Sequence, residues 1–258
     1  MPAPINPFKK ALADGEIQFG CWLGIPTGFT TELMGHAGFD WLVIDGEHGP
    51  QDYRATLNAL QVLAGTPAHP VVRVPVGDTV IIKQMLDLGA QTLLVPMVES
   101  AAQAEQLVRD VTYPPHGVRG VGFALSRAAG FSTIADYGKT ADAQICLLVQ
   151  VENRAGLAAL DEILAVEGVH GVFIGPSDLA ADMGHMSNPE HPDVQAAIMD
   201  AITRIRAAGK APGILSTRDP MTNAALEAGA QFVAVGADVL LLGTAARGLA
   251  AKWQATRG

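Results

Sequence analysis

The chain has 258 residues, of which 49% are apolar and 17% charged, so it can bury a large core as a single α/β barrel. The 26 acidic and 17 basic residues give a net charge of −9, which argues against nucleic acid or an anionic membrane as a partner. No signal peptide and no membrane span is evident, so we expect a cytoplasmic protein. Cys21 and Cys146 lie in apolar runs, as expected of buried free thiols in a reducing compartment.

Strand and helix patterns alternate along the chain about eight times. Four segments share one pattern, a helix-ending glycine and then a buried strand closed by Gly or Pro: residues 37–46, 89–97, 167–176 and 229–238. Four more strands are predicted at Gln18–Leu23, Val71–Val74, Ile145–Val151 and Pro212–Leu215. Helices are predicted at Gln51–Leu63, Val80–Leu88, Ala101–Val111, Ala155–Ala165, Pro192–Ala208 and Pro220–Ala228. This alternation predicts a closed (β/α)8 barrel, with residues 1–258 as one domain.

Two stretches fall outside this alternation. The segment from Tyr113 to Ala143 is longer than a normal connection and is expected to hold extra structure. After the last strand, Val239–Thr256 has the pattern of a long amphipathic helix. That helix would either close the barrel or pack on a neighbouring subunit.

The strongest functional signal is the stretch Phe39–Pro50, because active sites of parallel barrels form at the carboxyl ends of the strands. A short apolar run there is followed by Asp45, Glu47 and His48 among turn-forming residues. Asp45 could hold the His48 imidazole as a base, and Glu47 could hydrogen-bond a metal-bound water. The alternative is a solvated turn that happens to carry charge.

Other strand ends add polar and aromatic side chains, namely Trp22, Arg73, Gln150, Glu152, Asp178, Leu215 and Ser216. Arg73 lies between apolar neighbours, where an unpaired cation is costly. It should therefore face a carboxylate, that of Glu152, of Asp178 or of a substrate. A structural ion pair at the barrel mouth is the alternative.

Glu152 and Asp178 follow adjacent strands and offer oxygen ligands that suit Mg²⁺ or Mn²⁺. Gln150 lies two residues before Glu152, so it points to the same side of the strand. Helix N-capping is the alternative role of these carboxylates, above all for Asp178.

Three further observations narrow the chemistry. None of the six lysines follows a strand, which argues against a Schiff-base enzyme. No glycine-rich phosphate-binding motif indicates a nucleotide cofactor. The remaining histidines are expected to be structural: His36, His69, His116, His170, His185 and His191.

Together these motifs resemble those of the HpcH/HpaI aldolase family over nearly the whole chain. The matching segments are Gly20–Pro26, Phe39–Pro50, Val72–Pro75, YPPHGVRGVG, QVEN and IGPSDLA. The resemblance implies a metal-dependent class II lyase on a (β/α)8 barrel. Such an enzyme cleaves or forms 4-hydroxy-2-oxo acids through an enolate, with an aldehyde as the second product. The 2-oxo acid would be pyruvate or a relative such as hydroxypyruvate.

The resemblance also implies a role for each matching residue. Glu152 and Asp178 would hold Mg²⁺ or Mn²⁺, with Co²⁺ or Zn²⁺ as alternatives. Arg73 would bind the oxo acid and stabilise its enolate, and His48 with Asp45 would form the base. The pyruvate site would be completed by Trp22, Gln150, Gly175, Pro176 and Ser177, and Leu215 would border the aldehyde pocket.

Members of the family usually form hexamers, trimers of dimers with a swapped C-terminal helix, so the resemblance implies a homo-oligomer. The residues after YPPHGVRG would then reach towards a neighbour's active site. Two other functions stay open: a citrate-lyase-like lyase of acyl-CoA hydroxy acids, and a barrel that binds oxo acids without turning them over.

Overall fold

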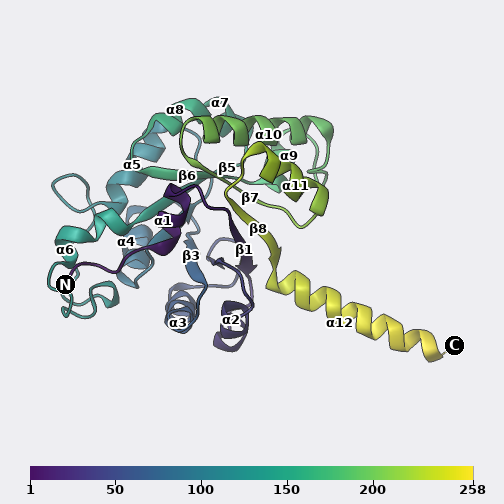
Figure 1. The fold of residues 1–258 in the computed structure, drawn as a ribbon, viewed down its shortest axis with the longest axis horizontal. Helices are drawn as coiled ribbons and strands as arrows, with labels where there is room; N and C mark the ends of the chain where they lie inside the picture. Colours follow the sequence, from purple (N-terminus) through teal and green to yellow (C-terminus); the bar gives the residue numbers. More distant parts are fainter. Residues whose placement is uncertain (258) are drawn as a thin grey trace.

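The computed structural model describes residues 1–257 and contains a closed barrel of eight parallel strands (Figure 1). The strands follow the chain order around the barrel, and β8 pairs with β1 to close it. They are β1 (Gln18–Leu23), β2 (Trp41–Asp45), β3 (His69–Arg73), β4 (Thr92–Val95), β5 (Cys146–Val151), β6 (Val169–Ile174), β7 (Ala211–Leu215) and β8 (Phe232–Ala237). The predicted (β/α)8 barrel is confirmed.

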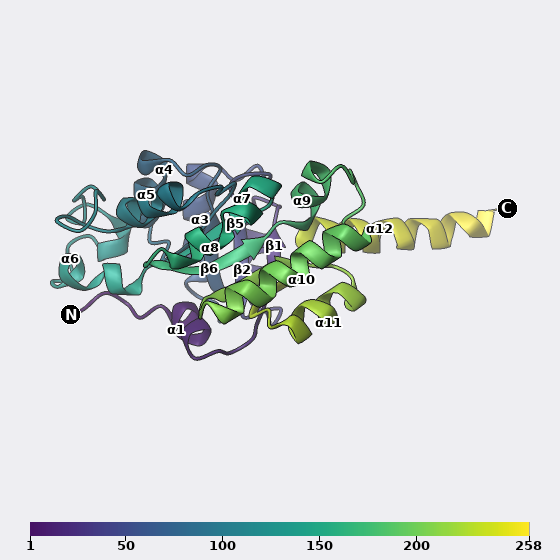
Figure 2. The ribbon, with the colours of Figure 1, turned by 90° about the horizontal axis from the view of Figure 1, so that it is seen from above.

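Most of the described helices surround the barrel on its outer side, whereas α1 lies at its lower end and α12 extends away from it (Figures 1 and 2). They are α1 (Pro7–Ala13), α2 (Gly28–Gly35), α3 (Tyr53–Leu63), α4 (Thr79–Asp87), α5 (Ala101–Val111), α6 (Tyr137–Thr140), α7 (Arg154–Ala158), α8 (Leu160–Ala165), α9 (Pro176–Asp182), α10 (Pro192–Ala207), α11 (Asp219–Ala228) and α12 (Asp238–Gln254). The helix predicted over Ala155–Ala165 is wrong as one element, because the backbone leaves helical geometry at Ala159 between α7 and α8.

The barrel interior is filled by aromatic side chains together with aliphatic ones such as Val43, Leu94 and Leu148, whereas the cluster on its outer face is aliphatic. Phe8 of α1 closes the lower end, with its ring 5.8 Å from that of Trp41 and 6.2 Å from that of Phe232. Gly20 and Gly213 make room for these rings, because a Cβ at either position would collide with Trp41 or Phe232. This packing closes the lower half of the barrel interior.

The long segment from Tyr113 to Ala143 holds α6 and two short 3₁₀ turns, Arg127–Ala129 and Asp142–Gln144, as expected of an insertion with structure of its own. Arg119 is fully buried there, 4.3 Å from the centre of the Tyr113 ring, and it pairs with Asp87 of α4 at 3.4 Å. This cation fixes the insertion against the barrel.

Helix α12 extends away from the barrel in both ribbon views (Figures 1 and 2). It is apolar on its exposed surface, with Leu240, Leu241, Leu242, Leu249 and Trp253 each more than half exposed. No described helix is both long enough and apolar enough to span a membrane.

Candidate active site

A cavity of about 350 Å³ opens at the carboxyl ends of the strands. The side chains predicted from the strand ends come together in its wall: Trp22, His48, Arg73, Gln150, Glu152, Gly175, Pro176, Ser177, Asp178 and Leu215. Phe173 of β6 also lines the cavity and was not predicted, because its apolar strand carries no polar signal. Asp45 and Glu47 contact Arg73 from β2 and the loop that follows it.

Arg73 is the cation of the site and is almost fully buried. Its Nε and Nη2 donate to the two carboxylate oxygens of Asp45 at 2.9 and 2.7 Å, and its Nη1 lies 2.8 Å from Glu47 Oε2. Parallel pairing of β2 with β3 places Asp45 directly beside Arg73. The prediction that Arg73 faces Glu152 or Asp178 is therefore wrong, because nearer carboxylates on β2 take that place.

Asp45 holds Arg73 and the backbone of the next loop, not the imidazole of His48. Its Oδ1 accepts hydrogen bonds from the backbone amides of Glu47 at 3.0 Å and His48 at 3.2 Å. Burial alone would raise the pKa of Asp45, but the hydrogen bonds and charge of Arg73, with these amides, bring that pKa below its ordinary value. Asp45 is consequently an ionised anchor, and no hydrogen bond joins it to the His48 ring within residues 1–257.

Glu152 projects from the end of β5 and is held by two donors. Its Oε1 accepts from the backbone amide of Met97 at 2.9 Å, and its Oε2 accepts from Gln150 Nε2 at 2.7 Å. Met97 has a φ of 56°, a conformation that is rare for a residue with a side chain and that aims its amide at Glu152. Gly175 packs against the same carboxylate, and a Cβ there would lie 2.8 Å from Glu152 Cβ and collide with Oε2.

The carboxylates of the cavity crowd one another. Burial raises the pKa of Glu152, and the charges of Glu47 and Asp178 add to that rise. Burial likewise raises the pKa of Glu47, against the positive charges of Arg73 and His48. A bound divalent cation would relieve this repulsion, so Glu152 and Asp178 fit a metal site by chemistry and position.

Asp178 lies in the first turn of α9, directly after β6, and its side chain is exposed. The amides of Ser177 and Asp178 have no preceding helical carbonyl to bond, so they remain available to a ligand. The alternative role of Asp178, to cap the start of α9, is not what the structure shows, since the N-cap residue of α9 is Gly175 and no side chain caps the helix.

The other side of the cavity is apolar. The Trp22 ring lies 5.4 Å from that of Phe173, and the Arg73 guanidinium lies 5.4 Å from the centre of the Trp22 ring. Leu215 extends this wall into an adjoining cavity of about 300 Å³, which also shares Pro176 and Ser177. Its lining continues over Ser187, Asn188, Pro189, Glu190, Ser216, Thr217, Arg218, Met221 and Leu240. This second cavity was not predicted, because loop residues of mixed type form it.

Known proteins similar to this chain include aldolases. A hydroxypyruvate/pyruvate aldolase of Roseobacter denitrificans is 58% identical over 254 residues, covering 98% of this chain and 99% of that protein. A 4-hydroxy-2-oxo-heptane-1,7-dioate aldolase of Shigella sonnei is 54% identical over 250 residues, covering 97% and 95%. The crystal structure of an HpcH/HpaI aldolase/citrate lyase family protein from Burkholderia cenocepacia matches with a TM-score of 0.92 at 38% identity, covering 98% of this chain and all of that one. The model of the HpcH/HpaI aldolase/citrate lyase family itself matches residues 18–245, and the chain belongs to this family.

Proposed function

We propose that this protein is a divalent-metal-dependent aldolase that cleaves or forms 4-hydroxy-2-oxo acids, with pyruvate or hydroxypyruvate as the oxo acid and an aldehyde as the other product. The names of the relatives support the reaction. The observation that carries it here is the cavity itself, whose wall contains a buried Arg73, the carboxylates of Glu152 and Asp178, and His48.

Arg73 would bind the carboxylate of the oxo acid. A guanidinium has five N–H donors, and hydrogen bonds to Asp45 engage two of them, one on Nε and one on Nη2. Nη1 lies 2.8 Å from Glu47 Oε2 as an ion pair without a hydrogen bond, so N–H groups on both terminal nitrogens remain for a substrate. Because Asp45 and Glu47 fix the plane of the guanidinium before a substrate arrives, its charge is preorganised for the negative charge that develops when a proton leaves the oxo acid.

Glu152 and Asp178 would hold the metal ion, Mg²⁺ or Mn²⁺, with Co²⁺ or Zn²⁺ as alternatives. When bound, the ion would supply Lewis-acid polarisation of the substrate's carbonyl oxygen. Gln150 keeps Glu152 in place through its Nε2. Its Oε1 is buried and has no partner in the described part of the chain, so a substrate hydroxyl or a water is expected to donate to it.

His48 would move the proton. It is the one histidine in the described lining of the cavity, and its side chain is exposed to solvent through the cavity mouth. Its backbone amide is tied to Asp45, and Glu47 lies close enough for the charges of the two side chains to interact. Glu47, rather than Asp45, would therefore stabilise a protonated imidazole.

We further propose a homo-oligomer, a hexamer by family likeness, in which α12 of one copy lies on a second copy. An apolar groove of about 540 Å³ next to the start of α12 is lined by Ile25, Phe29, Thr30, Leu33, Met34, Ala37, Phe39, Asp238, Leu241 and Leu242. Its apolar lining matches the exposed face of α12. Sedimentation should show Leu241→Asp and Leu242→Asp chains as smaller species than the parent, and an unchanged sedimentation coefficient would contradict this assembly.

Two expectations from the sequence are retained as proposals. Residues 1–258 would form one domain, which the closed barrel over β1 to β8 supports. A reducing, cytoplasmic location is supported by Cys21 and Cys146, which are both free and buried.

The first test is exchange of the pyruvate methyl protons in D₂O, followed by NMR with Mg²⁺ or Mn²⁺ and then with a chelator. This assay needs no choice of aldehyde. Exchange that requires the metal supports the proposal, and exchange that persists in chelator contradicts the role of the ion. No exchange with any metal would contradict pyruvate as the donor, and the same assay would then be repeated with hydroxypyruvate.

A further inference from the structure

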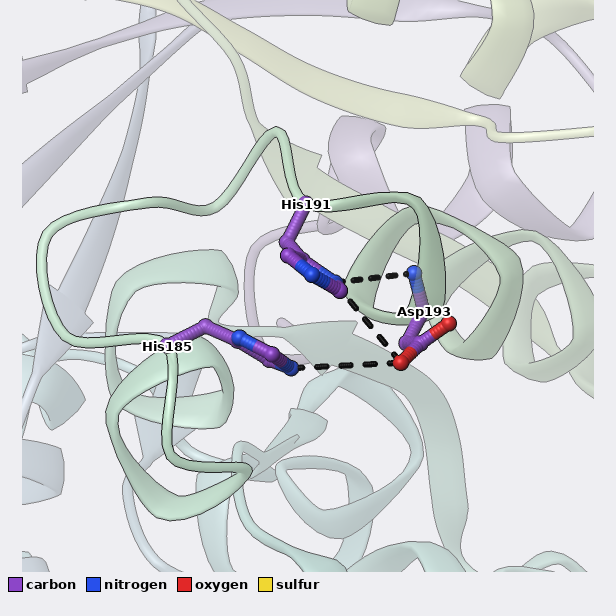
Figure 3. A group of neighbouring side chains, drawn as sticks. All are labelled: His185, His191 and Asp193. Atoms are coloured by element: carbon purple, nitrogen blue, oxygen red, sulfur yellow. Dashed lines mark hydrogen bonds and ion pairs between the residues drawn. The ribbon is translucent and has the colours of Figure 1, made fainter.

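A second group of metal-ligating side chains lies outside both cavities, on the loop between α9 and α10 (Figure 3). His185, His191 and Asp193 offer ligand atoms that all lie within 4.8 Å of one another. Within residues 1–257 this is the only set of three or more such side chains that meets this distance. His185 follows α9, whereas His191 and Asp193 flank the start of α10, so the group joins the two ends of the loop.

A ring nitrogen of each histidine approaches the same oxygen of Asp193 (Figure 3). His185 Nε2 lies 4.0 Å and His191 Nδ1 lies 3.7 Å from the same oxygen of Asp193, Oδ2. Tetrahedral ligands at bond lengths of about 2.0–2.2 Å are roughly 3.3–3.6 Å apart, so small side-chain shifts would close the site around an ion. The two imidazoles are stacked, with ring centres 3.5 Å apart and planes inclined by 13°. Because the lone pair of each ring nitrogen lies in its ring plane, one imidazole would have to rotate out of this stack before both nitrogens point at one ion.

The backbone holds this arrangement without an ion. The amide of His185 donates to Ala180 at 2.7 Å, that of Asn188 to His185 at 2.9 Å, and that of His191 to Asn188 at 3.1 Å. These turns bring both histidines together and keep their side chains about one-quarter to one-third exposed. The Asp193 amide donates to His191 Nδ1 at 3.2 Å, and an ion on that nitrogen would replace this bond. The freed amide is at a helix start, where water can accept from it.

We propose that His185, His191 and Asp193 form a second metal site that is selective for a transition metal such as Zn²⁺, Ni²⁺ or Cu²⁺. Two imidazoles with one carboxylate suit these ions, whereas Mg²⁺ prefers an all-oxygen set. The ion chemistry thus differs from that of Glu152 and Asp178, which offer oxygen alone. Three protein ligands leave a position for water or an outside ligand.

A bound ion would clamp the loop that forms one wall of the second cavity. Ser187 to Glu190 lie between the two histidines and line that cavity, and Glu190 pairs with Arg218 across it at 2.8 Å. The loop includes Ser187 at a φ of 61°, a conformation that an ion at its ends would help to maintain. Only this consequence for the cavity rests on the proposed aldolase function; the site itself does not.

The test is calorimetric titration of Zn²⁺ into the full-length, metal-stripped protein carrying Glu152→Gln and Asp178→Asn, which removes the other proposed site. We expect one Zn²⁺ per chain, no uptake of Mg²⁺, and loss of Zn²⁺ binding when His191→Ala is added. His116→Ala, which removes another loop histidine, should leave uptake unchanged. No Zn²⁺ binding in the double variant, or equal binding after His191→Ala, would overturn the proposal.

A second measurement protects the test against a variant that fails to fold. Cu²⁺ added at one equivalent to the Glu152→Gln, Asp178→Asn protein should give an electron paramagnetic resonance spectrum with coupling to imidazole nitrogens. A spectrum that shows only oxygen ligands would overturn the proposed site. This test leaves His185, His191 and Asp193 unsubstituted, so it does not depend on how a variant of these residues folds. The pyruvate exchange assay is independent of both results, so failure of the aldolase proposal and failure of the second site can be told apart.

Discussion

Asp45→Asn tests whether the anchor of Arg73 determines both stability and activity. The change removes the negative charge that accepts two hydrogen bonds from a guanidinium that is only 8% exposed. Breaking a buried ion pair from one side costs about 3–5 kcal/mol, but Glu47 stays in contact and the cavity admits water, so we expect a loss of about 2–3 kcal/mol. For a chain of this size that corresponds to a melting temperature lower by roughly 4–12 °C.

The assay is thermal unfolding at fixed protomer concentration in chelator, with Glu47→Gln as the matched control. Glu47 also contacts Arg73, but burial raises the pKa of Glu47, so its ionisation opposes folding and Glu47→Gln should not lower the melting temperature at pH 7. Because the pKa of Asp45 is lowered in the folded state, the stability that its charge supplies is present above the unfolded pKa of about 3.9. The gap between parent and Asp45→Asn should therefore be constant from about pH 5 to 8 and shrink as the pH falls through the folded pKa. Equal losses in the two variants, or a gap that grows in acid, would refute the reasoning.

Two further substitutions test the role of Glu152, the carboxylate that follows β5. Because the pKa of Glu152 is raised in the folded state, ionisation of this carboxylate lowers the free energy of unfolding. The loss begins as the pH rises above 4.5, the ordinary pKa of Glu, and is complete above the folded pKa. Glu152→Gln should therefore raise the melting temperature at pH 7 in chelator while abolishing the stabilisation that Mn²⁺ gives the parent, and a lower melting temperature would count against this. Gly175→Ala should displace Glu152 and weaken Mn²⁺ binding at least tenfold by calorimetry. Gly65→Ala is the control, because the added Cβ makes only an ordinary van der Waals contact and should leave Mn²⁺ binding unchanged. Equal Mn²⁺ affinity in the two variants would show that Glu152 does not bind the ion.

The barrel could be predicted from the sequence because its strands are buried on both sides. Uninterrupted apolar runs such as Trp41–Ile44 mark them directly, and Ala101–Val111 is a helix over the same residues in the structure. Helices α1 and α2 were missed, because seven or eight residues cover about two turns and show too little periodicity. The break at Ala159 was missed for a related reason, since no Pro or Gly marks it.

The members of the site could be predicted, but their pairing could not. Strand-end position alone places Arg73, Glu152 and Asp178 around one cavity. The partner of Arg73 depends on strand register, which sets Asp45 level with Arg73 on the adjacent strand. Both residues end their strands, so equal lengths of β2 and β3 would have indicated this pair. The hydrogen bond from the Met97 amide to Glu152 depends on a positive φ at Met97, which the residue type does not predict.

The division of charge across the cavity gives a physical reason for the proposed metal ion in addition to the Arg73 cation. Asp45, Glu47, Glu152 and Asp178 carry four negative charges when ionised, against the single positive charge of Arg73. Arg73 contacts only the two carboxylates from β2 and its loop, and the charges of Glu47 and Asp178 bear on Glu152 without a guanidinium in contact with it. A divalent ion at Glu152 and Asp178 would lower the net charge from −3 to −1 and allow an anionic oxo acid to enter. Arg73 could not do this from its place, because Asp45 fixes it on the other side of the barrel mouth.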